Sequence, residues 1–218
     1  MKNENTLKKK LVKLALPLSL EGLLTAGADF VDTLMVSSLG ETAVSAVGLG
    51  TQLFFIQSMT IYGFSGGAAT FLSQFYGSGN WKGIRKTLSI TICTALSFSI
   101  FIFALVLAIP EHLLQIFTHY SAVAEMGASY MVYRSPCLLI YSVVLPLVMA
   151  LKSTQHVKLP VFASCAAILS NLGLNYILIF GKFGFTAMGA DGAGLATTIS
   201  LLINLLILLG AMLVTKNP

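Results

Sequence analysis

Charged residues are scarce in this sequence. Only 10% of its 218 residues are Asp, Glu, Lys or Arg, whereas 56% are hydrophobic. A soluble domain carries about 25% charged residues, because charge covers the surface that meets water. The shortage excludes an ordinary soluble domain and predicts a protein that crosses a membrane several times.

The residue patterns of common catalytic and metal sites are also missing. The only three cysteines, Cys93, Cys137 and Cys165, fall in apolar segments, so we expect packing residues and no disulfide framework. There is no G-x-x-x-x-G-K-[ST] motif and no loop long enough for a nucleotide-binding domain. No nucleophile–base pair or metal-ligand spacing is visible either. These absences argue against an enzyme and against ATP-driven transport within this chain.

The hydrophobic segments predict an all-α, polytopic membrane protein with six transmembrane helices. A span needs about 20 mostly apolar residues. The predicted spans are about 11–38, 42–76, 87–109, 122–151, 159–180 and 192–214. Residues 1–10 are expected to form a basic cytoplasmic N-terminus, and 215–218 an interlobe linker or truncated end. Glycines in the second span predict bending or unwinding, and Pro136 and Pro146 predict kinks in the fourth.

The basic residues are distributed unevenly between the two predicted sides. Six spans place both termini on one side, which then receives eleven of the 13 Lys and Arg residues. Lys182 falls on the opposite side and Arg134 within a span. The positive-inside rule therefore predicts cytoplasmic termini in a plasma membrane, with a bacterial inner membrane as the expected location. The basic residues form no single basic face, so nucleic acid is not an expected partner.

Three acids lie inside the first span. Glu21, Asp29 and Asp32 each place a carboxylate where insertion costs about 2.5–3.5 kcal/mol at mid-membrane. Glu21 and Asp32 fall nearly on one stripe of the helix and Asp29 lies beside it. We therefore predict that all three line one watery cavity. Asp32 is the first candidate for holding a proton or cation.

Further polar residues in the spans are candidate partners for these acids. Arg134 in the fourth span needs a counter-charge, and we predict pairing with Glu21 or Asp29 in at least one state. Asn171 and Asn175 lie one turn apart on the fifth span and can orient a carboxylate or complete a cation site. Thr197 or Thr198 can add a hydroxyl from a small-residue face of the sixth span.

These segments resemble the N-terminal half of multidrug and toxic compound extrusion (MATE) transporters. The resemblance covers essentially the whole chain, in order. Its segments are Ala15–Pro17, Phe30–Val36, Ala43–Gly48, Ser73–Asn80, Asn175–Gly181 and Gly189–Thr198.

The resemblance implies an antiporter that exchanges external H⁺ or Na⁺ for amphipathic, often cationic, drugs. It implies that Asp32 couples the ion, with Asn171, Asn175 and Thr197 beside it and Na⁺ as a candidate metal at Asp32. No organic cofactor is expected. Some family members carry an aspartate at the position of Asn175, so this site has one fewer carboxylate. Glu21, Asp29 and Arg134 are not part of the family pattern and remain cavity-lining candidates.

The family has twelve spans in two lobes, with the cavity between them. The chain is thus expected to be one lobe, as a fragment, a truncated gene product or a half-transporter, whose partner is a second six-helix lobe. Two alternatives stay open. One is a flippase or exporter of lipid-linked saccharides with the same architecture, and the other is a non-transporting membrane subunit.

Overall fold

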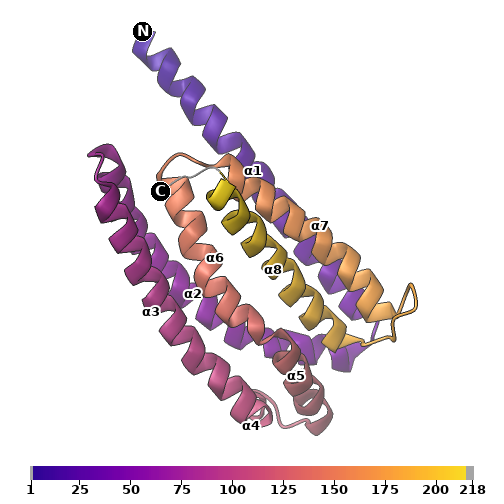
Figure 1. Ribbon diagram of the computed structural model, residues 1–218. Helices are drawn as coiled ribbons and strands as arrows, with labels where there is room; N and C mark the ends of the chain where they lie inside the picture. The colour runs from indigo at the N-terminus through magenta and orange to yellow at the C-terminus, as the bar shows by residue number, and fades with distance from the viewer. Residues whose placement is uncertain (1, 215–218) are drawn as a thin grey trace.

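The computed structural model describes residues 2–214, with side chains from Ala15 onward, and shows a bundle of helices (Figure 1). No strand occurs in this described part of the chain. The helices are α1 (Lys2–Ser37), α2 (Glu41–Gly77), α3 (Trp81–Ala108), α4 (Pro110–Gln115), α5 (Ser121–Arg134), α6 (Pro136–Ser153), α7 (Lys158–Phe180) and α8 (Ala190–Val214). The expected all-α membrane fold is confirmed.

Within residues 2–214, five helices are long and apolar enough to cross a membrane, namely α2, α3, α6, α7 and α8. Their outward faces carry large apolar side chains. Examples are Phe71 on α2 at 55% exposure, Phe101 on α3 at 61% and Phe162 on α7 at 65%. Such a surface suits lipid rather than water. Helix α1, which carries the three acids, is not among these five but runs alongside α7 (Figure 1).

Helix boundaries differ from the predicted spans in three places. Helix α1 begins at Lys2, within the predicted basic N-terminus, whereas 215–218 and the side chains of 1–14 lie outside the described residues. Helix α3 begins at Trp81 rather than 87, because the Asn80 side chain accepts from the N–H of Gly83 and caps it. The predicted span 122–151 is two helices, α5 and α6.

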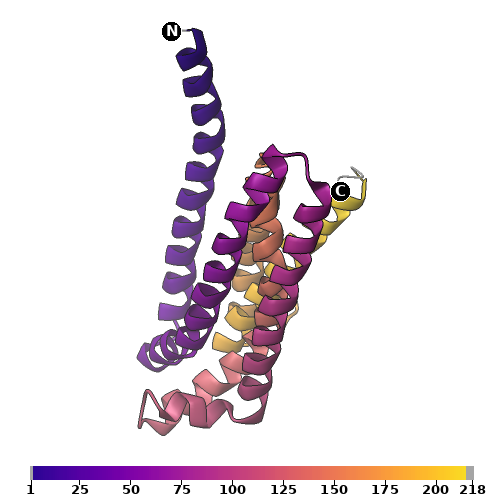
Figure 2. The ribbon, with the colours of Figure 1, turned by 90° about the vertical axis from the view of Figure 1, so that its left-hand side faces the viewer.

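The break between α5 and α6 lies at Ser135, directly before Pro136. Proline has no N–H to continue the hydrogen bonding of α5, and its ring clashes with the carbonyl of the preceding turn, so α5 ends and Pro136 opens a new helix at its first position. Ser135 itself keeps helical dihedral angles. Pro146 stays inside α6. Helix α2 keeps its helical hydrogen bonding throughout, without the unwinding that its glycines suggested, but its axis bends along its length (Figures 1 and 2).

The helices form two groups that meet along α8. Helices α1, α7 and α8 pack together, and α2 packs against α3, α5 and α6. Helix α8 joins the groups through α5 and α6, whereas direct contact between α1 and α2 is sparse. Figure 2 shows the first turns of α1 extending beyond the rest of the bundle. Both α1 and α2 line the cavity described below.

One end of the bundle carries the start of α1, the end of α8 and the α2–α3 and α6–α7 turns (Figure 1). Lys82, Arg85 and Lys86 open α3 at this end, and Lys152 and Lys158 flank the α6–α7 turn. Lys182 lies in the α7–α8 loop at the opposite end. The uneven placement of basic residues is thus a feature of the folded molecule.

Small residues let α8 lie unusually close to its neighbours. A Cβ on Gly192 would stand 2.8 Å from the backbone carbonyl of Leu178 in α7, and one on Gly194 would stand 3.0 Å from the carbonyl oxygen of Tyr130 in α5. The predicted small-residue face therefore packs as expected. It fixes the distance between α7 and α8, which carry the polar residues described below.

Gly192→Ala is expected to destabilise the protein by about 1–3 kcal/mol, because a methyl group cannot fit against the α7 backbone without moving a helix. Gly210→Ala is the control on the same helix, since no neighbouring atom of the described residues lies within 4 Å of its Cβ position. Thermal unfolding in detergent checks both variants. Equal midpoints for the two would contradict the close α7–α8 contact.

Candidate functional site

The carboxylate of Asp32 faces two side-chain amides on α7. Asn175 Nδ2 donates to Asp32 Oδ1 over 2.7 Å and also to Asn171 Oδ1 over 3.2 Å. Asn171 is 9% exposed and Asn175 only 1%. The one-turn spacing on α7 puts both amides on the same face, as predicted, and that face meets α1 at Asp32.

The amide of Asn171 has two useful orientations. Turned over, its Nδ2 donates to Asp32 Oδ2 over 2.8 Å and its oxygen accepts from the backbone N–H of Thr197 over 3.3 Å. In this orientation both carboxylate oxygens of Asp32 are held by amide donors. In the other orientation, the Asn171 oxygen faces the carboxylate and accepts from Asn175 instead.

One buried oxygen at this site has no partner. Asn175 Oδ1 is inaccessible, and no hydrogen-bond donor in the described part of the chain reaches it. An unpaired buried carbonyl is costly, by about 1–3 kcal/mol. Asp32 and Asn171 supply oxygen atoms of the kind that hard cations such as Na⁺ prefer, and the oxygen of Asn175 joins them only when its amide is turned over, because its Nδ2 faces them here. Proton binding to Asp32 is the alternative that the same carboxylate allows.

The hydroxyl of Thr197 does not join this set. It donates to the carbonyl of Ala193 in its own helix over 2.9 Å, so Thr197 contributes its backbone N–H. Thr198 likewise donates to carbonyls, of Tyr133 and Gly194, and lies 3.2 Å from Cys137 Sγ. The sequence thus placed Thr197 beside the asparagines but did not indicate which of its atoms faces them.

A cavity of about 800 Å³ lies next to the site, within the range of drug-sized pockets. Six of the described helices line it, namely α1, α2, α5, α6, α7 and α8. Asp29 and Asp32 stand on the α1 wall and Arg134 on the α5 wall. Between these charges the lining is largely apolar, with Phe54 and Val36 among its side chains. An amphipathic molecule with charged groups fits such walls.

Glu21 does not line this cavity, in contrast to the prediction. Its Oε2 lies 3.3 Å from Nζ of Lys152, at the end of α6, in an ion pair that is largely screened from water. The stripe pattern located Glu21 correctly on the α1 surface, but it carried no information about how far the cavity extends along α1. A lysine on another helix satisfies this carboxylate instead.

Arg134 pairs with neither Glu21 nor Asp29 among the described side chains. Its Nη1 donates to the hydroxyl of Tyr130 and, over 3.2 Å, to Thr51 Oγ1. The guanidinium also lies 4.7 Å from the centre of the Phe54 ring. The predicted counter-charge is therefore replaced in this conformation by hydroxyls and aromatic rings.

Tyr130, Thr51 and Phe54 are cavity residues that the sequence analysis missed. Tyr130 lies four residues before Arg134 and hence on the same helical face, which is a signal that spacing alone supplies. Thr51 and Phe54 come from α2, and nothing in the sequence joins them to Arg134. The buried Gln57, which donates to Ser99 Oγ over 2.8 Å and to the carbonyl of Leu138 over 3.0 Å, was also missed.

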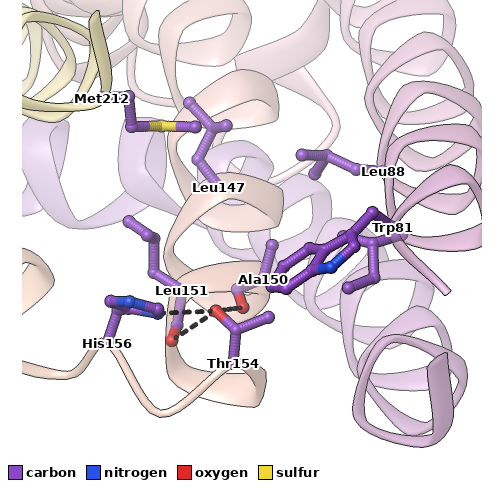
Figure 3. A pocket seen from close by; sticks show the side chains of 9 residues that line it. Trp81, Leu88, Leu147, Ala150, Leu151, Thr154, His156 and Met212 are labelled. Carbon is purple, nitrogen blue, oxygen red and sulfur yellow. Dashed lines mark hydrogen bonds between the residues drawn. The ribbon is translucent and has the colours of Figure 1, made fainter. Parts of the chain in front are cut away.

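A second hollow of about 50 Å³ lies at the basic end of the bundle (Figure 3). Trp81, Leu147 and Met212 are among its apolar lining residues, and His156 hydrogen-bonds to Thr154 at its edge over 3.2 Å. It is too small for a drug-sized ligand. Within the described residues, no group of three or more His, Cys, Asp or Glu side chains forms a metal cluster.

The model of the MatE family matches residues 17–177 of this sequence. The chain belongs to the MatE family. A probable multidrug resistance protein NorM from Neisseria meningitidis serogroup A is 32% identical over 187 residues, which are 86% of this chain and 41% of that protein. A probable multidrug resistance protein NorM from Thermotoga maritima is 28% identical, over 89% of this chain and 42% of that protein. These relatives are transporters rather than enzymes.

Solved MATE structures share the fold. A eukaryotic MATE transporter, AtDTX14, superposes with a TM-score of 0.80 and 22% identity, over 94% of this chain and 45% of that one. An outward-facing multidrug resistance MATE family transporter gives a TM-score of 0.85 at 19% identity. The match covers 96% of this chain and 46% of that one. The chain thus spans less than half the length of the MatE relatives and structures it matches. The expected resemblance to one half of a MATE transporter is confirmed.

Asn175→Leu is expected to destabilise the protein by about 1–3 kcal/mol, because the Asp32 carboxylate loses its 2.7 Å donor while it stays partly buried. Thermal unfolding at neutral pH checks this. Asn204→Leu is the matched control, since Asn204 is a buried asparagine on α8 whose Oδ1 meets no hydrogen-bond donor among the described residues. Similar losses of stability for both substitutions would contradict a stabilising role of the Asp32–Asn175 hydrogen bond.

Proposed function

We propose that this chain is one lobe of a cation-coupled antiporter that exports drugs or toxic organic cations across the cell membrane. The observation that carries the proposal is Asp32, a carboxylate that lines a drug-sized cavity while amides of α7 hold it. Membership of the MatE family and the similarity to multidrug resistance proteins support the same activity. A second six-helix lobe is proposed to complete the transporter.

Coupling is proposed to arise because the ion and the substrate compete for Asp32. When the carboxylate holds no ion, its negative charge attracts a positively charged group in the cavity. Binding of H⁺ or Na⁺ neutralises it, which removes that attraction and releases the substrate. An ion drives a conformational cycle only if it binds the two states with different affinity. Asp32 meets this condition if α1 moves relative to α7 between the states.

The two asparagines suit either ion. Turned one way, they donate to the carboxylate and stabilise the empty, charged site. Turned the other way, their oxygens join the carboxylate as ligands for Na⁺. H⁺ needs only the carboxylate itself. No organic cofactor enters this cycle.

The orientation in the membrane follows from charge. The end of the bundle that carries Lys82, Arg85, Lys86, Lys152 and Lys158 is proposed to face the cytoplasm, together with both termini. The two NorM proteins described above come from bacteria, so a bacterial inner membrane is the proposed location. In this orientation Asp32, near the opposite end of α1, lies close to the side from which the coupling ion enters.

Asp32→Asn is expected to lower ion-driven efflux by roughly 5- to 150-fold, the usual range of a coupling between two sites. The assay follows a fluorescent cationic dye in liposomes under an imposed H⁺ or Na⁺ gradient, with the lobe assembled into the complete transporter. The amide keeps the size and polarity of the side chain but removes its charge.

Glu111→Gln is the control, because it removes an exposed acid on α4, outside the cavity. Full gradient-driven export by the Asp32→Asn protein would contradict the coupling role of Asp32. Absence of dye transport by the unmodified transporter would instead favour a flippase or a non-transporting subunit.

A further inference from the structure

The hollow at the basic end of the bundle is a groove between two helices. Its sides are α3, with Trp81 and Leu88, and α8, with Met212, while α6 forms its floor through Leu147 and Ala150 (Figure 3). Helix α6 packs against both α3 and α8, whereas α3 and α8 make at most sparse contact with each other. The described residues that line this α3–α6–α8 groove are all different from those of the large cavity.

The lining of the groove suits a hydrocarbon chain. Ile84 and Leu151 are buried at its base, and Met212 is partly exposed at its side. The polar side chains, Thr154 and His156, lie where α6 ends, at the basic end of the bundle (Figure 3). Close packing is what favours association among apolar groups inside a membrane. The groove is too narrow for a drug-sized molecule, but one acyl chain can lie along it.

Helix α3 opens beside this groove with an unpaired basic cluster. Lys82, Arg85 and Lys86 are all exposed, and the first turn of α3 holds no acid. The N-terminus of a helix carries a partial positive charge, which disfavours cations and favours an anion. Among the described residues, none of the three cations forms an ion pair with an acid. The cluster therefore lacks the anion that its electrostatics favours.

Trp81 connects the basic cluster with the groove. Trp81, Ile84 and Leu88 share the face of α3 that lines the groove, and Arg85, four residues after Trp81, borders that face. The indole is 43% exposed and packs nearly perpendicular to the Tyr76 ring, with ring centres 5.9 Å apart. Its Nε1–H donates to no acceptor in the described part of the chain. Such a tryptophan is typical of the membrane–water interface, where its N–H meets lipid oxygens.

We propose that the α3–α6–α8 groove binds one anionic phospholipid, with the phosphate on Arg85 and an acyl chain between Trp81 and Met212. A guanidinium matches the geometry of a phosphate, and Lys82 and Lys86 add positive potential around the headgroup. The positive-inside rule accounts for the charge at this end, but it requires neither an apolar groove nor an unpaired indole beside that charge. The inference is independent of the export function, because it needs only a chain that crosses a membrane.

Trp81 is the only tryptophan in the sequence, so its fluorescence reports on the groove. Purified protein in non-ionic detergent micelles is titrated with two phospholipids whose identical acyl chains carry bromine, which quenches tryptophan on contact. One is phosphatidylglycerol, which is anionic, and the other is phosphatidylcholine, which is zwitterionic. We expect quenching by phosphatidylglycerol to saturate at a concentration about fivefold to tenfold lower, because each nearby basic residue contributes about fivefold.

Arg85→Gln is expected to weaken the binding of phosphatidylglycerol about fivefold and to leave that of phosphatidylcholine unchanged. Lys182→Gln is the control, because it removes an exposed cation at the opposite end of the bundle and should change neither titration. Inorganic phosphate, added at constant ionic strength, distinguishes a lipid from a free anion. We expect it to leave the quenching by phosphatidylglycerol in place.

Equal titration curves for the two lipids in the unmodified protein overturn the proposal, and this comparison needs no variant to fold. An unchanged preference for phosphatidylglycerol after Arg85→Gln overturns the assigned headgroup site. Full reversal of the quenching by inorganic phosphate also overturns the proposal, because the cluster then binds a free anion. None of these outcomes bears on ion-driven export, so the proposed function is tested separately.

Discussion

The structure depends on one constraint, the need to hold the Asp32 carboxylate inside a membrane-spanning bundle. A carboxylate at mid-membrane costs about 2.5–3.5 kcal/mol, and Asp32, near the end of α1, meets at most this cost. One hydrogen bond to a charged group contributes about 1.5–3 kcal/mol. The donors on α7 therefore offset much of the cost, and with both asparagines turned toward Asp32 they can offset all of it. The contact of Gly192 with α7 keeps α8 close behind this pair.

Holding Asp32 in this way also shapes the cavity. Helix α1 packs against α7 and makes only sparse contact with α2. Both α1 and α2 line the cavity. The break at Ser135 ends α5 directly after Arg134, which places the guanidinium on the wall across from the acids. The polar site and the cavity are thus consequences of the same helix arrangement.

Much of the fold followed from the sequence because the membrane leaves few choices. Apolar runs located most of the helices, and the one-turn spacing of Asn171 and Asn175 predicted their shared face. Contacts between distant helices did not follow. Glu21 and Asp32 have equivalent positions on the α1 stripe, yet one meets Lys152 and the other Asn175.

Arg134 shows the same limit. A buried arginine implies a counter-charge, and the sequence offered two acids at a suitable depth. The structure satisfies it with hydroxyls from Tyr130 and Thr51 instead. Helical periodicity gives the direction of a side chain around its own axis. It does not give the depth or tilt of the neighbouring helix that the side chain meets, and those decide its partner.

The most direct test of the account is whether the coupling ion and the substrate compete at Asp32. The measurement is the dissociation constant of a cationic dye for the purified protein, titrated against Na⁺ concentration and against pH. The account predicts that the constant rises with at least one of these ions in the unmodified protein and is independent of both after Asp32→Asn. A dissociation constant that does not change with either ion in the unmodified protein would contradict it.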